Sequence, residues 1–99
     1  TGAIFHYAMA ATARVKITNR LGMHARPAML LAEVAQEFDS DISIRRTDHE
    51  DTVDAKSIMQ LMMLAATEGT ELEIKATGSD AEASIQRLVE LIKTGFDED

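Results

Sequence analysis

Apolar residues recur along the chain with two different periods, and the order of these periods limits the fold more than any other feature of the sequence. Stretches in which every second residue is apolar predict strands with one buried face. These strands are expected over residues 13–18, 42–45, 53–56 and 71–77. Stretches with apolar residues three or four positions apart predict helices with one apolar stripe. The stripes run over residues 31–38, 58–65 and 85–92, which gives the order β-α-β-β-α-β-α.

The predicted elements suit a two-layer α+β fold. Strands with a single apolar face leave their other face to water, and three helices with one stripe each can cover the apolar face together. We therefore expect an open-faced β-sandwich. A ferredoxin-like fold begins with the same βαββαβ string, so periodicity leaves the strand order within the sheet open.

The length of the chain fits one domain. A chain of 99 residues can bury one core of ordinary size. We expect this domain to span residues 13–92. Residues 1–12 are interpreted as an N-terminal extension or a remnant of cloning, with Met9 as a candidate natural start, and the acidic residues 93–99 as a frayed, solvated tail.

Local signals indicate where the helices begin and end. Pro27 suits the first turn of the first helix, because its missing N–H loses no intrahelical bond there. Ser57 suits the N-cap of the second helix, and Gly69 suits its C-terminal end. Ser79 and Glu82 have the spacing of a capping box at the start of the third helix.

Composition argues against several classes of function. A net charge of -7 disfavours non-specific nucleic-acid binding, which needs a basic surface. The absence of cysteine excludes disulfides, thiolate nucleophiles and cysteine-ligated zinc. Apolar stretches are far shorter than the about 20 residues that cross a bilayer, and the first residues do not resemble a secretory signal, so we expect a cytoplasmic protein without membrane insertion. His6, His24 and His49 lack metal-ligand spacing, so neither a metal nor another cofactor is expected.

The acidic residues are unevenly distributed. Residues 1–46 hold six basic and four acidic residues, and no acidic residue precedes Glu33. The basic residues that flank His24 in the sequence are Arg14, Lys16, Arg20 and Arg26. This distribution fits a local site for an anion, although scattered surface charge gives the same pattern.

The segment Gly22-Met23-His24-Ala25-Arg26-Pro27 carries the strongest chemical signal. It places His24 immediately before a helix start, where free backbone N–H groups and the positive end of the helix dipole favour an anion. A phosphoryl group on His24 could accept hydrogen bonds from the N–H groups of Ala25 and Arg26 and from the Arg26 guanidinium. The alternative from these residues alone is that His24 caps the helix and Arg26 is a solvated charge.

Four segments together resemble one protein family. Residues 22–28, G-M-H-A-R-P-A, resemble the active-site signature of HPr, the histidine-containing phosphocarrier protein family of the phosphoenolpyruvate-dependent phosphotransferase system. Residues 56–59, K-S-I-M, resemble the second signature of the family. Residues 68–74 and 78–81 are also similar to family sequence, and the resemblance extends over residues 13–92.

The resemblance implies a four-stranded antiparallel sheet with three helices on one face, and a phosphocarrier rather than an enzyme. His24 would accept a phosphoryl group on Nδ1 from phosphorylated Enzyme I and pass it to a histidine of an enzyme IIA domain. Arg26 would help to hold the phosphoryl group. Such a carrier is expected to be a monomer with transient interfaces.

The resemblance also implies roles for the second helix. In many bacteria, the serine that matches Ser57 is a regulatory phosphorylation site of a dedicated kinase, HPr kinase/phosphorylase. Ile58 and Met59 match residues of the docking surface, and Met23 could extend this patch, because thioethers adapt to varied partners. The helical stripe places Met62 in the core instead.

Several points stay open at the level of sequence. The connection 46–52 is longer and more acidic than the usual turn of the family, and Gln60 stands where a small residue is frequent. The sequence does not separate a sugar-uptake carrier from its nitrogen-related regulatory paralogue. A docking module controlled by Ser57 phosphorylation alone is a further alternative. A small ferredoxin-like nucleic-acid binder is disfavoured by the net charge of -7 and by having only four aromatic residues.

Overall fold

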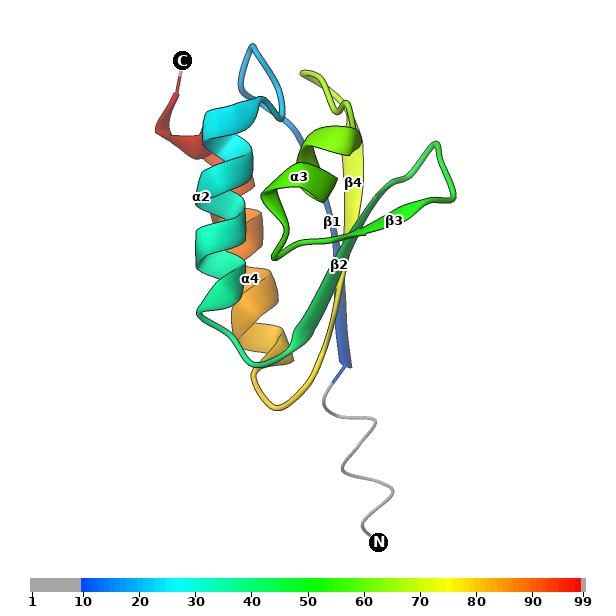
Figure 1. Ribbon diagram of the computed structural model, residues 1–99, viewed down its shortest axis with the longest axis vertical. Coiled ribbons are helices and arrows are strands. Elements are labelled where there is room, and N and C mark those ends of the chain that lie inside the picture. Colours follow the sequence, from blue (N-terminus) through cyan, green and yellow to red (C-terminus); the bar gives the residue numbers. More distant parts are fainter. Residues whose placement is uncertain (1–9, 99) are drawn as a thin grey trace, which may run out of the picture.

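Four strands form one sheet, and the helices cover one of its faces (Figure 1). The computed structural model describes residues 10–98, so residues 1–9 of the expected extension lie outside the described part. The elements are β1 (Ala10–Lys16), α2 (Ala25–Gln36), β2 (Asp41–Arg46), β3 (Thr52–Asp54), α3 (Ile58–Met63), β4 (Glu71–Thr77), α4 (Ala81–Lys93) and the short 3-10 helix η1 (Gly95–Asp97). The predicted open-faced α+β sandwich is confirmed, and β1 begins three residues earlier than its predicted start.

Strand β4 lies between β1 and β2, and β3 forms the edge beyond β2. All three strand pairs are antiparallel, and the register places Ile74 of β4 opposite both Ala13 of β1 and Ile44 of β2. Strand β1 is therefore an edge strand, whereas a ferredoxin-like sheet holds its first strand in the interior. The strand order, which periodicity left open, is therefore not that of a ferredoxin-like fold.

The core lies between the sheet and the helices, where alternate strand residues meet the helical stripes. The buried apolar residues of the strands are Val15, Ile42, Ile44, Leu72, Ile74 and Ala76. Those of the helices are Ala28, Leu31, Ala32, Ala35, Leu61, Ala81, Ile85, Leu88 and Ile92. No helix within residues 10–98 is long and apolar enough to cross a membrane.

The other face of the sheet is polar. Glu73 of β4 lies opposite Arg14 of β1 and Arg45 of β2 in the register. Its carboxylate contacts Arg14 Nε at 3.6 Å and Arg45 Nη2 at 3.0 Å. The hydrogen bond from Arg45 is the main cause that lowers the pKa of Glu73. Cross-strand pairs of opposite charge suit a face that stays in water.

The predicted capping box at the start of α4 is wrong. The N-cap is Asp80 and not Ser79, and the Asp80 side chain makes no cap hydrogen bond. Its carboxylate instead accepts hydrogen bonds from the N–H groups of Asp39 and Ser40, the last two residues before β2. The N-cap therefore lies one residue after the predicted Ser79, and its side chain makes a tertiary contact in place of a cap hydrogen bond.

Two predictions for α3 are also wrong. The helix ends at Met63 with Leu64 as its C-cap, so Gly69 lies in the following loop, where its N–H donates to the carbonyl of Ile17 at 2.8 Å. Met62 is 45% exposed, and Leu61 is the buried residue of this helix. Because α3 has only six residues, it buries one side chain rather than a full stripe.

The acidic end of the described chain is not frayed. After α4 the chain turns into η1, and Phe96 is fully buried in the core. The hydroxyl of Thr18 donates to the carbonyl of Ile92 at 3.2 Å, which ties this region to the segment after β1. The prediction of a solvated tail is therefore wrong for residues 94–98. Burial of the Phe96 side chain stabilises the folded segment more than solvation of the acidic neighbours stabilises an open tail.

Candidate functional site

The loop before α2 is held by close backbone contacts. Gly22 has a φ of +70°, and a Cβ at this position would lie 2.3 Å from the carbonyl oxygen of Ala66. The N–H of Met23 donates to the same carbonyl at 2.8 Å. Only glycine fits this position, since both its φ and its distance to the backbone exclude a side chain. The loop that carries His24 is therefore fixed against the loop after α3.

His24 is the N-cap residue of α2, as predicted. Its carbonyl accepts from the N–H of Ala28 at 3.0 Å, but its side chain makes no cap hydrogen bond. The ring is 35% exposed, so it is accessible from solvent. The N–H groups of Ala25 and Arg26 lie in the first turn of α2, where a helix offers them no internal acceptor. The site therefore combines an accessible imidazole with free backbone donors.

Glu98 contacts both His24 and Arg26, the two side chains of the predicted phosphoryl site. The Nε2 atom of His24 lies 3.1 and 3.0 Å from the two Glu98 carboxylate oxygens. Arg26 Nη1 donates to Glu98 at 3.1 Å and to the carbonyl of Phe96 at 3.3 Å. The hydrogen bond from His24 is the main cause that lowers the pKa of Glu98, and Asn19 and Arg26 lower it further. Among the contacts of residues 10–98, the Nδ1 atom of His24 has no hydrogen-bond partner.

Asn19 connects the loop before α2 to Glu98. Its side chain is almost fully buried, and its Nδ2 atom donates to the carbonyl of Gly22 at 2.8 Å and to Glu98 at 3.0 Å. Its Oδ1 atom is buried without a hydrogen-bond partner within residues 10–98. The sequence analysis predicted neither Asn19 nor Glu98 as a residue of this site. The one available signal was Phe96, an aromatic residue among acidic ones that indicates an anchored segment.

The basic residues that precede His24 do not gather around it. The side chain of Arg14 lies on the outer face of the sheet, where it pairs with Glu71 at 3.9 Å and with Glu73. Lys16 is two residues further along the same strand and therefore lies on the same face. Of the four basic residues that flank His24 in the sequence, Arg26 is the one that shares the Glu98 carboxylate with His24, and Arg20 is exposed four residues before His24.

The residues proposed for docking separate into two groups. Met23 is only 5% exposed and belongs to the core, so it does not extend a docking patch. Met59 is 78% exposed, and Ile58 is partly exposed beside it on α3. Ser57 is the N-cap of α3, as predicted, and its Oγ accepts from the N–H of Gln60 at 3.2 Å. The exposed apolar residues of α3, which we call the α3 patch, are Ile58, Met59, Met62 and Met63.

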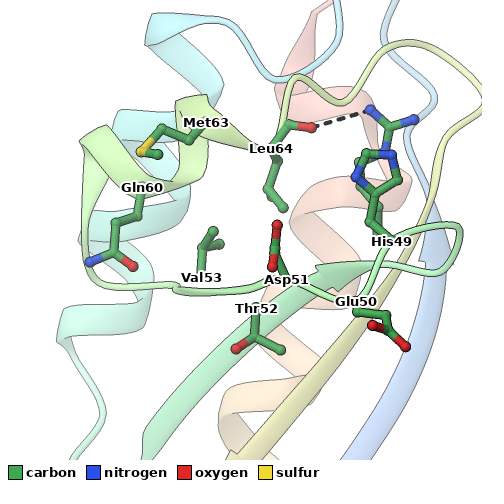
Figure 2. Close-up of a pocket in the computed structure, with 9 residues that line it drawn as sticks. His49, Glu50, Asp51, Thr52, Val53, Gln60, Met63 and Leu64 are labelled. Atoms are coloured by element: carbon green, nitrogen blue, oxygen red, sulfur yellow. Dashed lines mark hydrogen bonds between the residues drawn. The ribbon is translucent and has the colours of Figure 1, made fainter.

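A surface groove of about 570 Å³ lies between the 46–52 connection and α3 (Figure 2). Glu50, Asp51, Gln60 and Met63 are among its lining residues, which include neither His24 nor Arg26. The groove is therefore separate from the His24 site. Within residues 10–98, no group of three His, Asp or Glu side chains is arranged to hold a metal ion.

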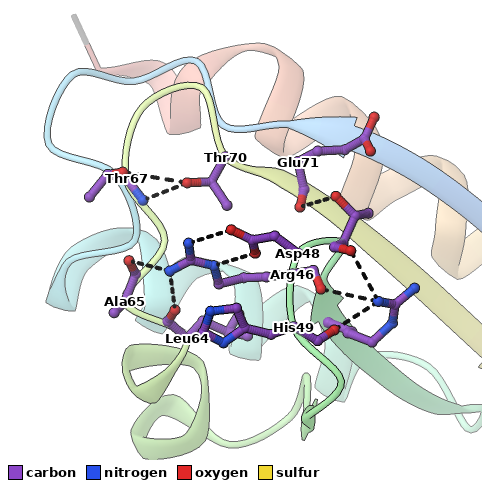
Figure 3. A network of polar contacts seen from close by, with 10 residues as sticks. Arg46, Asp48, His49, Leu64, Ala65, Thr67, Thr70 and Glu71 are labelled. Atoms are coloured by element: carbon purple, nitrogen blue, oxygen red, sulfur yellow. Dashed lines mark hydrogen bonds and ion pairs between the residues drawn. The ribbon is translucent and has the colours of Figure 1, made fainter.

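A network of hydrogen bonds fixes the 46–52 connection (Figure 3). Arg46 forms two bonds of 2.9 Å with the carboxylate of Asp48, and this contact is the main cause that lowers the pKa of Asp48. Arg46 also donates to the carbonyls of Leu64 and Ala65 at 3.3 and 3.2 Å. The acidic connection is therefore anchored to the loop that follows α3.

Comparisons with known proteins identify the family. The family model described as the phosphorylation site of the PTS HPr component matches residues 11–94. Phosphocarrier protein NPr of Escherichia coli strain K12 is 44% identical over 85 residues, which cover 86% of this chain and 93% of that protein. Phosphocarrier protein HPr of Xylella fastidiosa strain Temecula1 is 39% identical over 83 residues, which cover 84% of this chain and 91% of that protein. The crystal structure of HPr-C-His from Thermoanaerobacter tengcongensis matches with a TM-score of 0.83 and 37% identity, covering 90% of this chain and 98% of that chain.

Sequence and fold agree in these comparisons. The range matched by the family model contains His24 and Arg26, and the structural match covers 90% of this chain. The resemblance drawn from four short segments is therefore confirmed. The chain belongs to the HPr family of the phosphotransferase system, whose members are phosphocarriers that exchange phosphoryl groups with partner proteins and are not enzymes.

Proposed function

We propose that His24 is the phosphoryl acceptor of this phosphocarrier. In this proposal, Nδ1 takes the group from phosphorylated Enzyme I and passes it to a histidine of an enzyme IIA domain, in the cytoplasm and as a monomer. The observation that carries it is the asymmetry of the ring. Nε2 is held by Glu98, whereas Nδ1 has no partner among residues 10–98 and the ring is accessible.

The site has the groups that such a transfer needs. The lone pair of Nδ1 attacks phosphorus, and the bond from phosphorus to the donor breaks with its electron pair staying on the donor. The N–H groups of Ala25 and Arg26 can then donate to the phosphoryl oxygens. Arg26 uses only Nη1 in its contacts with Glu98 and Phe96, so its other N–H groups are available to the same oxygens. Positioning and charge stabilisation supply most of the catalysis in phosphoryl transfer.

The direct test is labelling from phosphoenolpyruvate in the presence of Enzyme I. We expect an acid-labile, alkali-stable phosphoryl group on the wild type and none on His24→Ala. His49→Ala is the matched control, because His49 lies in an exposed connection away from the site. Labelling of His24→Ala at the wild-type level would refute the assignment.

The nitrogen-related branch is the second, narrower candidate. It is supported by the relatives named NPr in Escherichia coli and Proteus mirabilis, which are 44% and 41% identical to this chain. Its test compares kcat/KM for Enzyme I of the sugar-uptake branch with kcat/KM for its nitrogen-related counterpart. We expect a preference of about tenfold or more for the nitrogen-related donor. A preference for the sugar-uptake donor would assign the chain to the other branch.

We infer that the α3 patch is the docking surface and that Ser57 is its regulatory site. Ser57 lies directly before Ile58 and Met59, so a phosphate there would add about two negative charges beside the exposed apolar side chains. Such a charge weakens docking to an acidic partner. Incubation with ATP and HPr kinase/phosphorylase should modify the wild type and Ser43→Ala but not Ser57→Ala. Equal modification of Ser57→Ala would exclude this site.

A further inference from the structure

Three hydrogen-bond donors from the segment between β1 and the first turn of α2 meet at one carboxylate. Glu98 accepts from Asn19 Nδ2, His24 Nε2 and Arg26 Nη1 at 3.0 to 3.1 Å. Because a carboxylate only accepts hydrogen bonds, the His24 nitrogen that faces it has to carry the ring proton. This contact therefore selects the Nε2–H tautomer and leaves the lone pair on Nδ1.

The segment 94–98 is shaped to bring Glu98 to this position. The φ values of Phe96 and Asp97 are 56° and 58°, which residues other than glycine rarely adopt. Backbone hydrogen bonds from Asp97 to Thr94 and from Glu98 to Gly95 close the turn. Strained backbone of this kind persists only where its surroundings hold it, and here the fully buried Phe96 does so.

We propose that Glu98 is a positioning residue for phosphoryl transfer, which holds the His24 ring through Nε2 so that Nδ1 presents its lone pair to the donor. The inference rests on the proposed acceptor role of His24. Glu98 acts through the ring and not on the phosphoryl group, in the way that carboxylates behind metal-binding histidines fix ring orientation and tautomer.

The same contact assists both directions of transfer. When Nδ1 gains its bond to phosphorus, Nε2 keeps its proton, so the ring becomes positively charged. Glu98 balances this charge from 3.0 Å. In the return step, the bond between Nδ1 and phosphorus breaks and its electron pair goes to the ring. A ring that is still protonated on Nε2 accepts that pair more readily than an unprotonated one, because it leaves as neutral imidazole.

The test compares Glu98→Gln with Asp97→Asn. Both variants change one carboxylate to an amide and alter the net charge equally, but Asp97 is exposed and Asn tolerates its positive φ. Two-bond ¹H–¹⁵N spectra of the unphosphorylated proteins report the His24 tautomer, and rapid-quench labelling from phosphorylated Enzyme I reports the transfer rate. In Glu98→Gln, an amide NH₂ replaces one acceptor oxygen and faces other donors. We therefore expect the pure Nε2–H pattern to be lost and the rate to fall about tenfold.

The control and the wild type make each outcome decisive. Asp97→Asn should keep the wild-type tautomer pattern and a rate within about twofold of wild type. The positioning role is overturned if Glu98→Gln keeps both the pattern and the rate, if it transfers faster, or if Asp97→Asn shows the same losses. A wild type that takes up no label overturns the acceptor role and the positioning role with it. Failure of the acceptor role can be told apart from failure of the positioning role alone, because the tautomer pattern is recorded on protein that has met no phosphoryl donor.

Discussion

The Asp80 carboxylate and the Ser40 residue lie 40 positions apart in the chain and are joined by hydrogen bonds from the Ser40 N–H and from its hydroxyl group. Ser40 is almost fully buried, and a Cβ on Gly78 would lie 2.6 Å from its Oγ. The start of α4 is therefore joined to the turn before β2 by a contact that leaves no room for a side chain at position 78.

Asp80→Asn should lower the thermal midpoint of unfolding, because the amide loses one acceptor oxygen in a site where every partner is a donor. Differential scanning calorimetry measures this change. Asp51→Asn is the control, since Asp51 is exposed, and should leave the midpoint nearly unchanged. Equal midpoints for the two variants would contradict the assigned role of Asp80.

Stability should fall in acid, and Asp80 should account for part of the fall. The hydrogen bond from the Ser40 hydroxyl is the main cause that lowers the pKa of Asp80 in the folded state below its ordinary value of about 3.9. A group of this kind adds stability that is complete above the unfolded pKa and is lost as pH falls through the folded pKa. Urea unfolding between about pH 5 and pH 2 should therefore show a shallower loss of stability in Asp80→Asn than in the wild type. Parallel curves would exclude this contribution.

Gly22→Ala should be much more damaging than Gly69→Ala. Both glycines have positive φ values, 70° and 88°, but a Cβ at position 69 meets no atom within 4 Å. Gly69→Ala should therefore cost only the conformational penalty of about 1 to 2 kcal/mol. Gly22→Ala adds a collision with the Ala66 carbonyl and should also displace His24. Urea unfolding gives the two costs, and amide chemical shifts of residues 22–28 detect the displacement. Equal costs would show that the loop relaxes freely.

Phe96→Ala should destabilise the fold by about 3 to 5 kcal/mol, the usual cost of removing a buried aromatic side chain. It should also release Glu98 from His24 and so slow phosphoryl transfer. Phe96→Leu keeps most of the buried volume and should retain most of both properties. Chemical unfolding and labelling measure the two effects. A Phe96→Ala protein with wild-type stability would show that the 94–98 segment is not anchored as described.

Met59→Ala should raise the KM for Enzyme I without unfolding the protein. The side chain is exposed, so its removal should change the free energy of unfolding by no more than about 0.5 kcal/mol. Lys75→Ala on the outer sheet face is the control for a distant exposed position and should leave KM unchanged. An unaltered KM in Met59→Ala would remove Met59 from the docking surface.

The repeating part of the fold was predictable, because strands and helices impose their own periods on the sequence. Residues such as Val15, Leu31 and Leu72 could be placed in the core from spacing alone. The residues at which the helices and strands begin and end were harder to predict. Ser79 and Asp80 are adjacent and both suit an N-cap, and the choice between them depends on Ser40, far away in the chain.

The site was predictable where its residues are neighbours in the sequence. His24 and Arg26 lie two positions apart at one helix start, so local spacing identified them. Glu98 lies 74 positions from His24, and its contact depends on how α4 packs against β1 and how η1 turns back after α4. Burial was equally hard to predict for methionine. Met23 was expected at the surface and is buried, whereas Met62 was expected in the core and is 45% exposed.

The polar face of the sheet gives the molecule a place where probes can be attached. The helices cover the other face of the sheet (Figure 1). Lys75 on β4 is exposed and lies between the buried residues Ile74 and Ala76, so a label there lies on the face opposite the helices. The chain contains no cysteine, so Lys75→Cys would be its single thiol and would react at one position only. One fluorophore there can follow each partner's arrival and departure in real time.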